Sequence, residues 1–156
     1  GAQGPFLKSV LERLSHCCGD DPDLLSRIVA ISSLISIDNA HGVHPNYLER
    51  HDDKHRPVLN AGPVIKLNAN QRYASNSHSI ALFKSICDTV KVPHQSFVMR
   101  NDMACGSTIG PITSAETGIN TIDVGVPTFA MHSIRELAGS QDAYDLYKVI
   151  NSFYSR

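Results

Sequence analysis

Hydrophobic and polar positions alternate in blocks along the chain, and the spacing within each block predicts a helix or a strand. Apolar residues recur at helical spacing after Pro5, after Asp21-Pro22-Asp23 and after Asn76-Ser77, all of which are favourable helix starts. The short apolar runs between these blocks are typical of strands inside a sheet. The predicted helices span residues 5–14, 21–30, 77–90, 109–118 and 142–154, and the predicted strands span 33–37, 64–67, 97–99 and 121–124.

This alternation predicts an α/β fold in which a layered sheet carries helices on both faces. The chain has 156 residues, enough to bury a substantial core, and its 42% hydrophobic and 19% charged residues are ordinary for a globular protein. We therefore expect one domain at most over residues 1–156. The polar stretch over residues 46–62 predicts a long loop, and long loops in compact domains are commonly functional.

Charge and cysteine content exclude several classes of protein. The formal net charge is −1, and no block of Lys and Arg suggests a nucleic-acid partner. The apolar runs are too short to span a bilayer, and the N-terminus does not resemble a signal peptide, so we expect a cytoplasmic location. Cys17 and Cys18 are adjacent while Cys87 and Cys105 stand alone, which favours reduced thiols over a C-x-x-C metal or redox motif.

Candidate chemistry begins where the apolar run Ile28–Ile37 ends. This run predicts a buried helix end and an inner strand, and Asp38, His41 and His44 follow it directly. A carboxylate at the mouth of a strand is costly unless a cation or hydrogen-bond donors meet it. The first hypothesis is therefore a metal site that includes Asp38.

A second candidate ligand, His132, lies at the end of the otherwise apolar segment Val124–Met131. Zinc, cobalt and manganese accept neutral imidazole and carboxylate ligands, and two-metal peptidases gather such ligands from distant loops. Asp38 and His132 form the natural pair, and we expect them to meet at the carboxyl ends of two strands.

Four segments of the chain resemble the C-terminal part of the aspartyl aminopeptidase family, and its bacterial branch in particular. They are SIDNAHGVHPNY (36–47), HRPVLNAGPVIKLNANQRYAS (55–75), MRNDMACGSTIGPI (99–112) and PTFAMHSIRELAGS (127–140). The resemblance implies a dinuclear metallopeptidase that removes the N-terminal residue of a peptide substrate. It also implies two divalent metal ions in each full-length active site, with zinc favoured over cobalt or manganese.

The resemblance also implies roles for particular residues. It places metal ligands at Asp38 and His132, and it places substrate-binding positions at His41, Lys66, Tyr73 and Gly106. A lysine can neutralise an acidic N-terminal side chain, and a tyrosine hydroxyl can stabilise the oxyanion that forms when water attacks the carbonyl.

Other motifs of the family precede the part that this sequence resembles. The family's His-x-Asp motif, its metal-bridging Asp and its Glu-Glu pair precede the region that Gly1–Leu14 resembles, and this chain has no Glu-Glu pair. The resemblance therefore implies a C-terminal segment of the catalytic domain, without the general-base glutamate, the upstream ligands or the dimerisation insert. It implies a homo-oligomer for the full-length enzyme.

Each candidate also has a simpler interpretation. Asp38 could cap a turn, His132 could be a hydrogen-bonded and partly buried histidine, and Lys66 could be a solvated strand residue. Glu136, one helical turn beyond His132, could orient that ring, or it could form a surface ion pair with Arg135 or face solvent. Tyr73 could be half-buried packing, and His44 could support a turn before Pro45.

Two alternative functions stay open from the sequence. A non-catalytic α/β fragment could act as an assembly or interaction module. Cys105, beside a predicted helix start, could instead be the nucleophile of a Cys-His hydrolase, because a helix N-terminus stabilises a thiolate.

Overall fold

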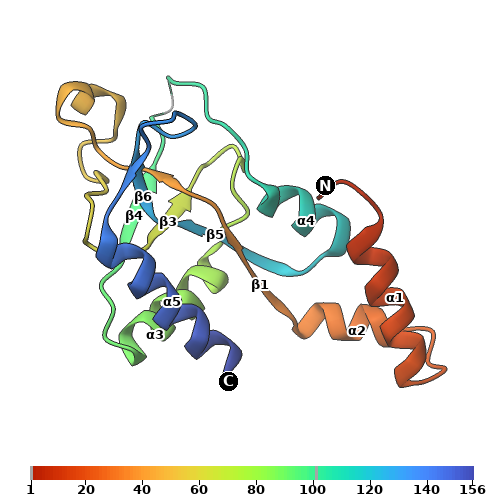
Figure 1. The fold of residues 1–156 in the computed structure, drawn as a ribbon. Coiled ribbons are helices and arrows are strands. Elements are labelled where there is room, and N and C mark those ends of the chain that lie inside the picture. Colours follow the sequence, from red (N-terminus) through yellow and green to blue (C-terminus); the bar gives the residue numbers. More distant parts are fainter. Residues whose placement is uncertain (1, 101) are drawn as a thin grey trace.

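The computed structural model describes residues 2–100 and 102–156, and helices and strands alternate along them (Figure 1). The helices are α1 (Phe6–Cys18), α2 (Leu24–Ile31), α3 (Ser77–Thr89), α4 (Ile109–Thr117), α5 (Ser140–Tyr154) and the short 3-10 helix η1 (Pro45–Arg50). The strands are β1 (Ser33–Ile37), β2 (Ala40–His41), β3 (Val64–Leu67), β4 (Gln95–Val98), β5 (Asn120–Gly125), β6 (Pro127–Phe129) and β7 (Leu137–Ala138).

Four of the strands form the main sheet, in the order β1-β5-β3-β4. Strand β1 runs parallel to β5, and β3 runs parallel to β4, whereas β3 and β5 are antiparallel. All four predicted strands are therefore present. The prediction that residues 33–37 form an inner strand is wrong for the described chain, because β1 lies at an edge of the sheet.

The buried helix end predicted before β1 is also wrong. Ile31, the last residue of α2, is 86% exposed, and Ile28 is exposed as well. An apolar run shows only that a segment is fit for burial, and the partner that buries it must come from elsewhere in the fold. In the described chain nothing covers this end of α2.

Helices cover both faces of the main sheet, as predicted. Figure 1 shows α3 and α5 together below the sheet and α4 above it. The core between the sheet and the lower helices includes Ile65 and Val124 from the strands, Phe83 and Ile86 from α3, and Val149 from α5. The layered α/β prediction is confirmed.

Local signals in the sequence explain why α3 and α4 begin and end where they do. The Asn76 side chain accepts hydrogen bonds from the backbone N–H groups of His78 and Ser79, which caps the start of α3. Helix α4 ends at Gly118, whose φ of 79° lies in the left-handed region that glycine adopts without strain.

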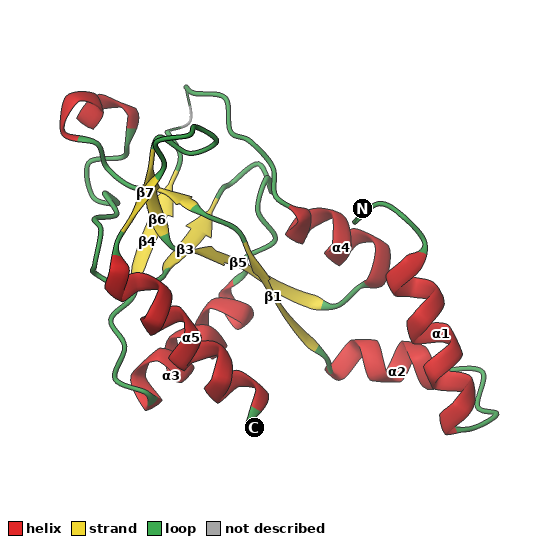
Figure 2. Cartoon of the chain, in the orientation of Figure 1, coloured by secondary structure: helices red, strands yellow, loops and turns green. Residues whose placement is uncertain are grey.

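A second, smaller sheet with the order β2-β6-β7 lies beside the main one and was not predicted (Figure 2). The expected loop over residues 46–62 includes most of η1, and the His44 ring caps that helix by accepting a hydrogen bond from Asn46 N at 3.1 Å. Within the described residues, no helix is both long and apolar enough to cross a membrane.

The proposed helical turn between His132 and Glu136 is absent. Residues 130–136 form turns between β6 and β7, so Glu136 is not one helical turn beyond His132. Its carboxylate instead accepts a hydrogen bond from Asn39 Nδ2 at 2.9 Å. Pairing of β7 with β6 sets the path of this segment more strongly than its own helix propensity.

Candidate metal and substrate site

Asp38 is the first residue after β1, at the carboxyl end of that strand. Its backbone N–H donates to Val124 O at 3.1 Å, and its carboxylate accepts a hydrogen bond from Asn39 N at 2.8 Å. Gly125 lets the Asp38 backbone approach β5 this closely, because a Cβ at Gly125 would lie 1.7 Å from Asp38 O. The Asp38 side chain is exposed, so it can cap the Asn39 N–H and still present oxygen atoms to a cation.

His132 lies in the turn after β6, and its backbone is unusual. Its φ is 68°, and that of Ala130 is 52°, both in the left-handed region that residues other than glycine seldom adopt. Such strained positions gather at functional sites, where the surrounding structure holds them. The His132 side chain is exposed, which argues against the interpretation of a partly buried structural histidine.

His41, the last residue of β2, lies within electrostatic reach of both candidate ligands. Partial burial lowers the pKa of the His41 imidazole, and the positive charges of His51, Lys66 and His132 lower it further. The Asp38 carboxylate acts in the opposite direction. Residues from the ends of β1, β2 and β6 therefore share one electrostatic environment, and the net effect favours a neutral His41 ring.

Lys66 and Tyr73 form a buried pair. Lys66, in β3, is only 2% exposed, so the interpretation of a solvated strand lysine is wrong. Its Nζ lies 5.7 Å from the centre of the Tyr73 ring. Burial lowers the pKa of the Lys66 ammonium, while the nearby carboxylates of Asp38 and Asp123 act to raise it.

The Tyr73 hydroxyl is held in its neutral form. Burial is the main reason why the pKa of the phenol is raised, and a hydrogen bond with the Cys105 side chain raises it further. A neutral phenol keeps its proton at neutral pH and can donate it in a hydrogen bond. The side chain is 8% exposed, so packing and hydrogen bonding are compatible roles.

Asp123 is a buried carboxylate that sequence reasoning did not select. It is fully buried in β5 and accepts hydrogen bonds from Ser36 Oγ at 2.6 Å, Thr108 Oγ1 at 2.7 Å and Ala74 N at 2.6 Å. It thereby connects β1, the start of α4 and the segment that carries Tyr73. An acidic residue inside an apolar strand was the available signal, since a carboxylate is rarely buried without partners.

In this glycine-rich segment, Gly110 is the glycine that the rest of the chain crowds. A Cβ at Gly110 would lie 2.3 Å from Asp123 Oδ1, whereas a Cβ at Gly106 would meet nothing within 4 Å. Crowding therefore explains Gly110, while the substrate-binding role of Gly106 stays a prediction. Gly106 follows Cys105, whose carbonyl accepts a hydrogen bond from Arg72 Nε at 3.1 Å.

The Cys-His hydrolase alternative finds no support in the geometry. Cys105 is half-buried, and its thiol contacts the Tyr73 hydroxyl. Across residues 2–100 and 102–156, no histidine ring makes a hydrogen bond with this thiol. A thiol nucleophile needs such a base within reach.

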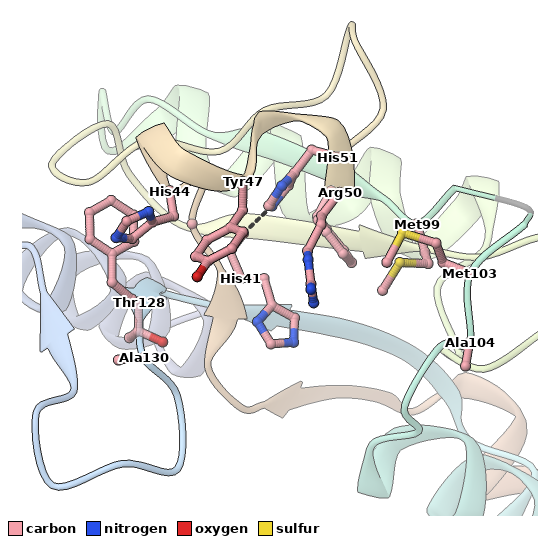
Figure 3. A pocket seen from close by; sticks show the side chains of 13 residues that line it. His41, His44, Tyr47, Arg50, His51, Met99, Met103, Ala104, Thr128 and Ala130 are labelled. Atoms are coloured by element: carbon pink, nitrogen blue, oxygen red, sulfur yellow. Dashed lines mark hydrogen bonds between the residues drawn. The ribbon is translucent and has the colours of Figure 1, made fainter.

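His41 also lines a cavity of about 430 Å³ (Figure 3). The residues that line it are His41, Gly42, His44, Tyr47, Arg50, His51, Phe97, Met99, Met103, Ala104, Thr128, Phe129 and Ala130. Lys66 and Tyr73 are not among them. The buried Phe97 ring packs against the Tyr73 ring and against the rings of His41 and His51, so it separates the Lys66 pair from the cavity.

The described residues supply only part of a metal site. Asp38 and His132 offer the donor types that zinc prefers, carboxylate oxygen and imidazole nitrogen. Within residues 2–100 and 102–156, however, no group of three His, Cys, Asp or Glu side chains lies close enough together to hold a metal ion. The donor chemistry fits zinc, but the number of donors falls short of a complete site.

Comparison with known proteins assigns the family. The model of the family described as aminopeptidase I zinc metalloprotease (M18) matches residues 1–154. The chain belongs to the M18 aminopeptidase family, and the resemblance drawn from its motifs is confirmed.

Individual relatives agree with this assignment. A probable M18 family aminopeptidase 2 of Azotobacter vinelandii is 61% identical over 155 residues, which are 99% of this chain and 35% of the relative. In the cryo-EM structure of the Ape4 and Nbr1 complex, one chain matches with 47% identity and a TM-score of 0.95, over 99% of this chain and 29% of that one. The S. cerevisiae mApe1 dodecamer matches with 32% identity and a TM-score of 0.86, over 100% of this chain and 34% of that one. The chain thus spans about a third of the length of its relatives.

Proposed function

We propose that this chain is the C-terminal segment of the catalytic domain of a zinc aminopeptidase that hydrolyses the N-terminal peptide bond of a peptide and prefers acidic N-terminal residues. The observation that carries the proposal is the placement of Asp38 directly after β1 and of His132 in the turn after β6, together with the adjacent buried side chains of Lys66 and Tyr73. Membership of the M18 family supports the reaction class.

Asp38 and His132 are the residues of this chain that would hold metal. A catalytic zinc site usually has three protein ligands, so further ligands and the general base would come from parts of a longer protein that this chain does not include. When bound, zinc polarises the scissile carbonyl and lowers the pKa of water. Two ions per full-length site, with zinc as the metal, are part of the proposal.

The other site residues of this chain would bind the substrate and stabilise charge. Tyr73 keeps its phenolic proton and would donate a hydrogen bond to the oxygen of the attacked carbonyl. His41, whose pKa is lowered, would line the substrate as a neutral ring. Lys66 would receive an acidic N-terminal side chain, and Gly106 would offer its backbone to the substrate.

Replacing Lys66 with Met in the full-length enzyme should lower kcat/KM for substrates with N-terminal Asp or Glu by about 1.5–3 kcal/mol, the range for hydrogen bonds to charged groups. Methionine keeps the length and the burial of the side chain but removes its charge. Substrates with N-terminal Leu should lose little. Steady-state kinetics on a panel of N-terminal residues measures the difference.

An equal loss on Asp and Leu substrates would show that Lys66 supports the structure or the general catalytic step instead of selectivity. Arg156→Met provides a matched control, because it removes a positive charge from the exposed end of the described chain. In that variant, the ratio of kcat/KM for N-terminal Asp substrates to kcat/KM for N-terminal Leu substrates should equal that of the unchanged enzyme.

The 156-residue chain by itself should have no appreciable peptidase activity and should bind zinc weakly. Two donor groups do not make a catalytic zinc site, and no group of three possible metal ligands lies together among the described residues. A zinc-supplemented aminopeptidase assay, run with light scattering to establish the mass of the active species, tests this. Robust turnover by a monomer of this length, blocked by a chelator, would contradict the proposed division of the site.

We also expect the full-length protein to form a homo-oligomer, since the structural relative mApe1 of S. cerevisiae is a dodecamer. The cytoplasmic location stays a prediction from the sequence.

A further inference from the structure

We propose that the cavity lined by His41 binds the part of the peptide on the carboxyl side of the scissile bond, and that Arg50 receives a carboxylate there. This inference rests on the proposed aminopeptidase function and adds a specificity-determining residue to it. The carboxylate would be either the free C-terminus of a dipeptide or an acidic side chain in the second residue.

The position of the cavity assigns it to this part of the substrate. His41 lines the cavity and also lies within electrostatic reach of Asp38, His132 and Lys66. The α-amine and the first side chain would lie with Asp38, His132 and Lys66, none of which lines the cavity. The chain beyond the scissile bond would then continue into the space of about 430 Å³ that His41 lines.

The Arg50 guanidinium gives the lining a positive charge, which favours an anion. Arg50 and the imidazoles of His41, His44 and His51 line the cavity, and no acidic residue of the described chain does. Figure 3 shows the Arg50 side chain reaching into the same space as His41. Arg50 lies over the Tyr47 ring, with its Cζ 5.2 Å from the ring centre, and has no carboxylate within ion-pair distance among residues 2–100 and 102–156.

Two other arginines, which follow Arg50 in the sequence, do have carboxylate partners. Arg56 pairs with Asp53, and Arg100 pairs with Asp102 at 2.6 Å. A guanidinium presents a planar set of donors that suits a carboxylate, and stacking on Tyr47 holds its plane. Arg50 is therefore positioned to bind a carboxylate that the described chain does not supply.

The rest of the wall suits the hydrocarbon part of a peptide and its polar backbone. Phe97, Phe129, Met99 and Met103 give apolar surface, and methionine adapts to side chains of different shape. Two polar atoms of lining residues, His51 Nδ1 and Thr128 Oγ1, are buried without a hydrogen-bond partner in the described part of the chain. Buried polar atoms normally have partners, and a bound peptide carries both donors and acceptors.

The test uses the full-length enzyme and Arg50→Gln, a change at an exposed residue that folding should tolerate. The substrates are Asp-Ala, Asp-Ala-amide and Asp-Glu-amide, all with the same N-terminal residue. The ratio of kcat/KM for Asp-Ala to that for Asp-Ala-amide should fall about tenfold or more if Arg50 binds the free C-terminus. The ratio for Asp-Glu-amide to Asp-Ala-amide should fall by the same factor if Arg50 binds a side chain.

Two further variants make the result specific to Arg50. Arg50→Lys keeps the charge, so its kcat/KM ratios should lie between those of Arg50→Gln and the unchanged enzyme, with the recovery in KM. Arg56→Gln removes an arginine that does not line the cavity and should leave both kcat/KM ratios unchanged. The inference would be overturned if kcat/KM fell by one common factor on all three substrates. It would also be overturned if the loss in kcat/KM depended on whether the N-terminal residue is Asp or Leu. An unchanged enzyme that cleaves none of these peptides would instead overturn the proposed function.

Discussion

Replacing His132 with Ala in the full-length enzyme is expected to lower both zinc content and kcat/KM, the latter by about a hundredfold or more. Even residues that merely orient metal ligands change metal affinity or activity by about 10–100-fold, so loss of a ligand should cost at least as much. The exposed ring of His132 lies in a strained turn, so its removal takes away an imidazole donor without opening a hole in the core. Metal analysis and steady-state kinetics on the same preparation measure both effects.

His78→Ala is the matched control for this experiment. His78 is also an exposed histidine, but it lies at the start of α3, where its ring contacts the Asn120 side chain at 2.8 Å. This variant should keep its zinc and its activity. If His132→Ala kept both as well, His132 would not be a metal ligand, and its left-handed backbone would need another explanation.

Replacing Asp123 with Ala is expected to lower the free energy of unfolding by about 3–5 kcal/mol, because buried donors that lose their acceptor each cost about 1–3 kcal/mol. Three donors lose their partner at once: the Ser36 hydroxyl, the Thr108 hydroxyl and the Ala74 N–H. Urea unfolding followed by far-UV circular dichroism gives the difference. Asp123→Asn, which keeps the size and one acceptor oxygen, should lose less.

Asp20→Ala serves as the control for the stability experiment. Asp20 is exposed in the turn between α1 and α2, so its loss should change the free energy of unfolding by less than about 0.5 kcal/mol. A cost for Asp123→Ala no greater than that for Asp20→Ala would show that the buried carboxylate does not hold these segments together.

The main elements of the fold could be predicted because their signals are local. Asn76 caps the helix that follows it, Gly118 ends another, and the strand Val64–Leu67 is an apolar run of the right length. The small sheet gave no such signal. Its strands have two or three residues each, and Ala40–His41 becomes a strand only by pairing with Pro127–Phe129, which is distant in sequence.

The site was predictable only in part, and for a similar reason. The motifs around Asp38 and His132 point to a family, but they do not show how deeply a residue is buried. Lys66 is enclosed because it lies in an inner strand of a folded sheet, which residue type alone does not reveal. Arg50 lies in a polar loop that resembles any solvated segment until Tyr47 and the cavity are placed beside it.

The pairing of β1 with β5 also sets the order in which this chain can fold during synthesis. Ser36 and Asp123, which meet across these strands, are 87 residues apart in the sequence. Closing so long a loop costs entropy before any contact repays it, and an N-terminal segment leaves the ribosome well before its C-terminal partner. Asp38 therefore emerges early, but β5 and the turn that carries His132 follow only when translation of this region is nearly finished. The nascent chain accordingly completes the proposed pair of metal donors late, after most of the sequence around it has been made.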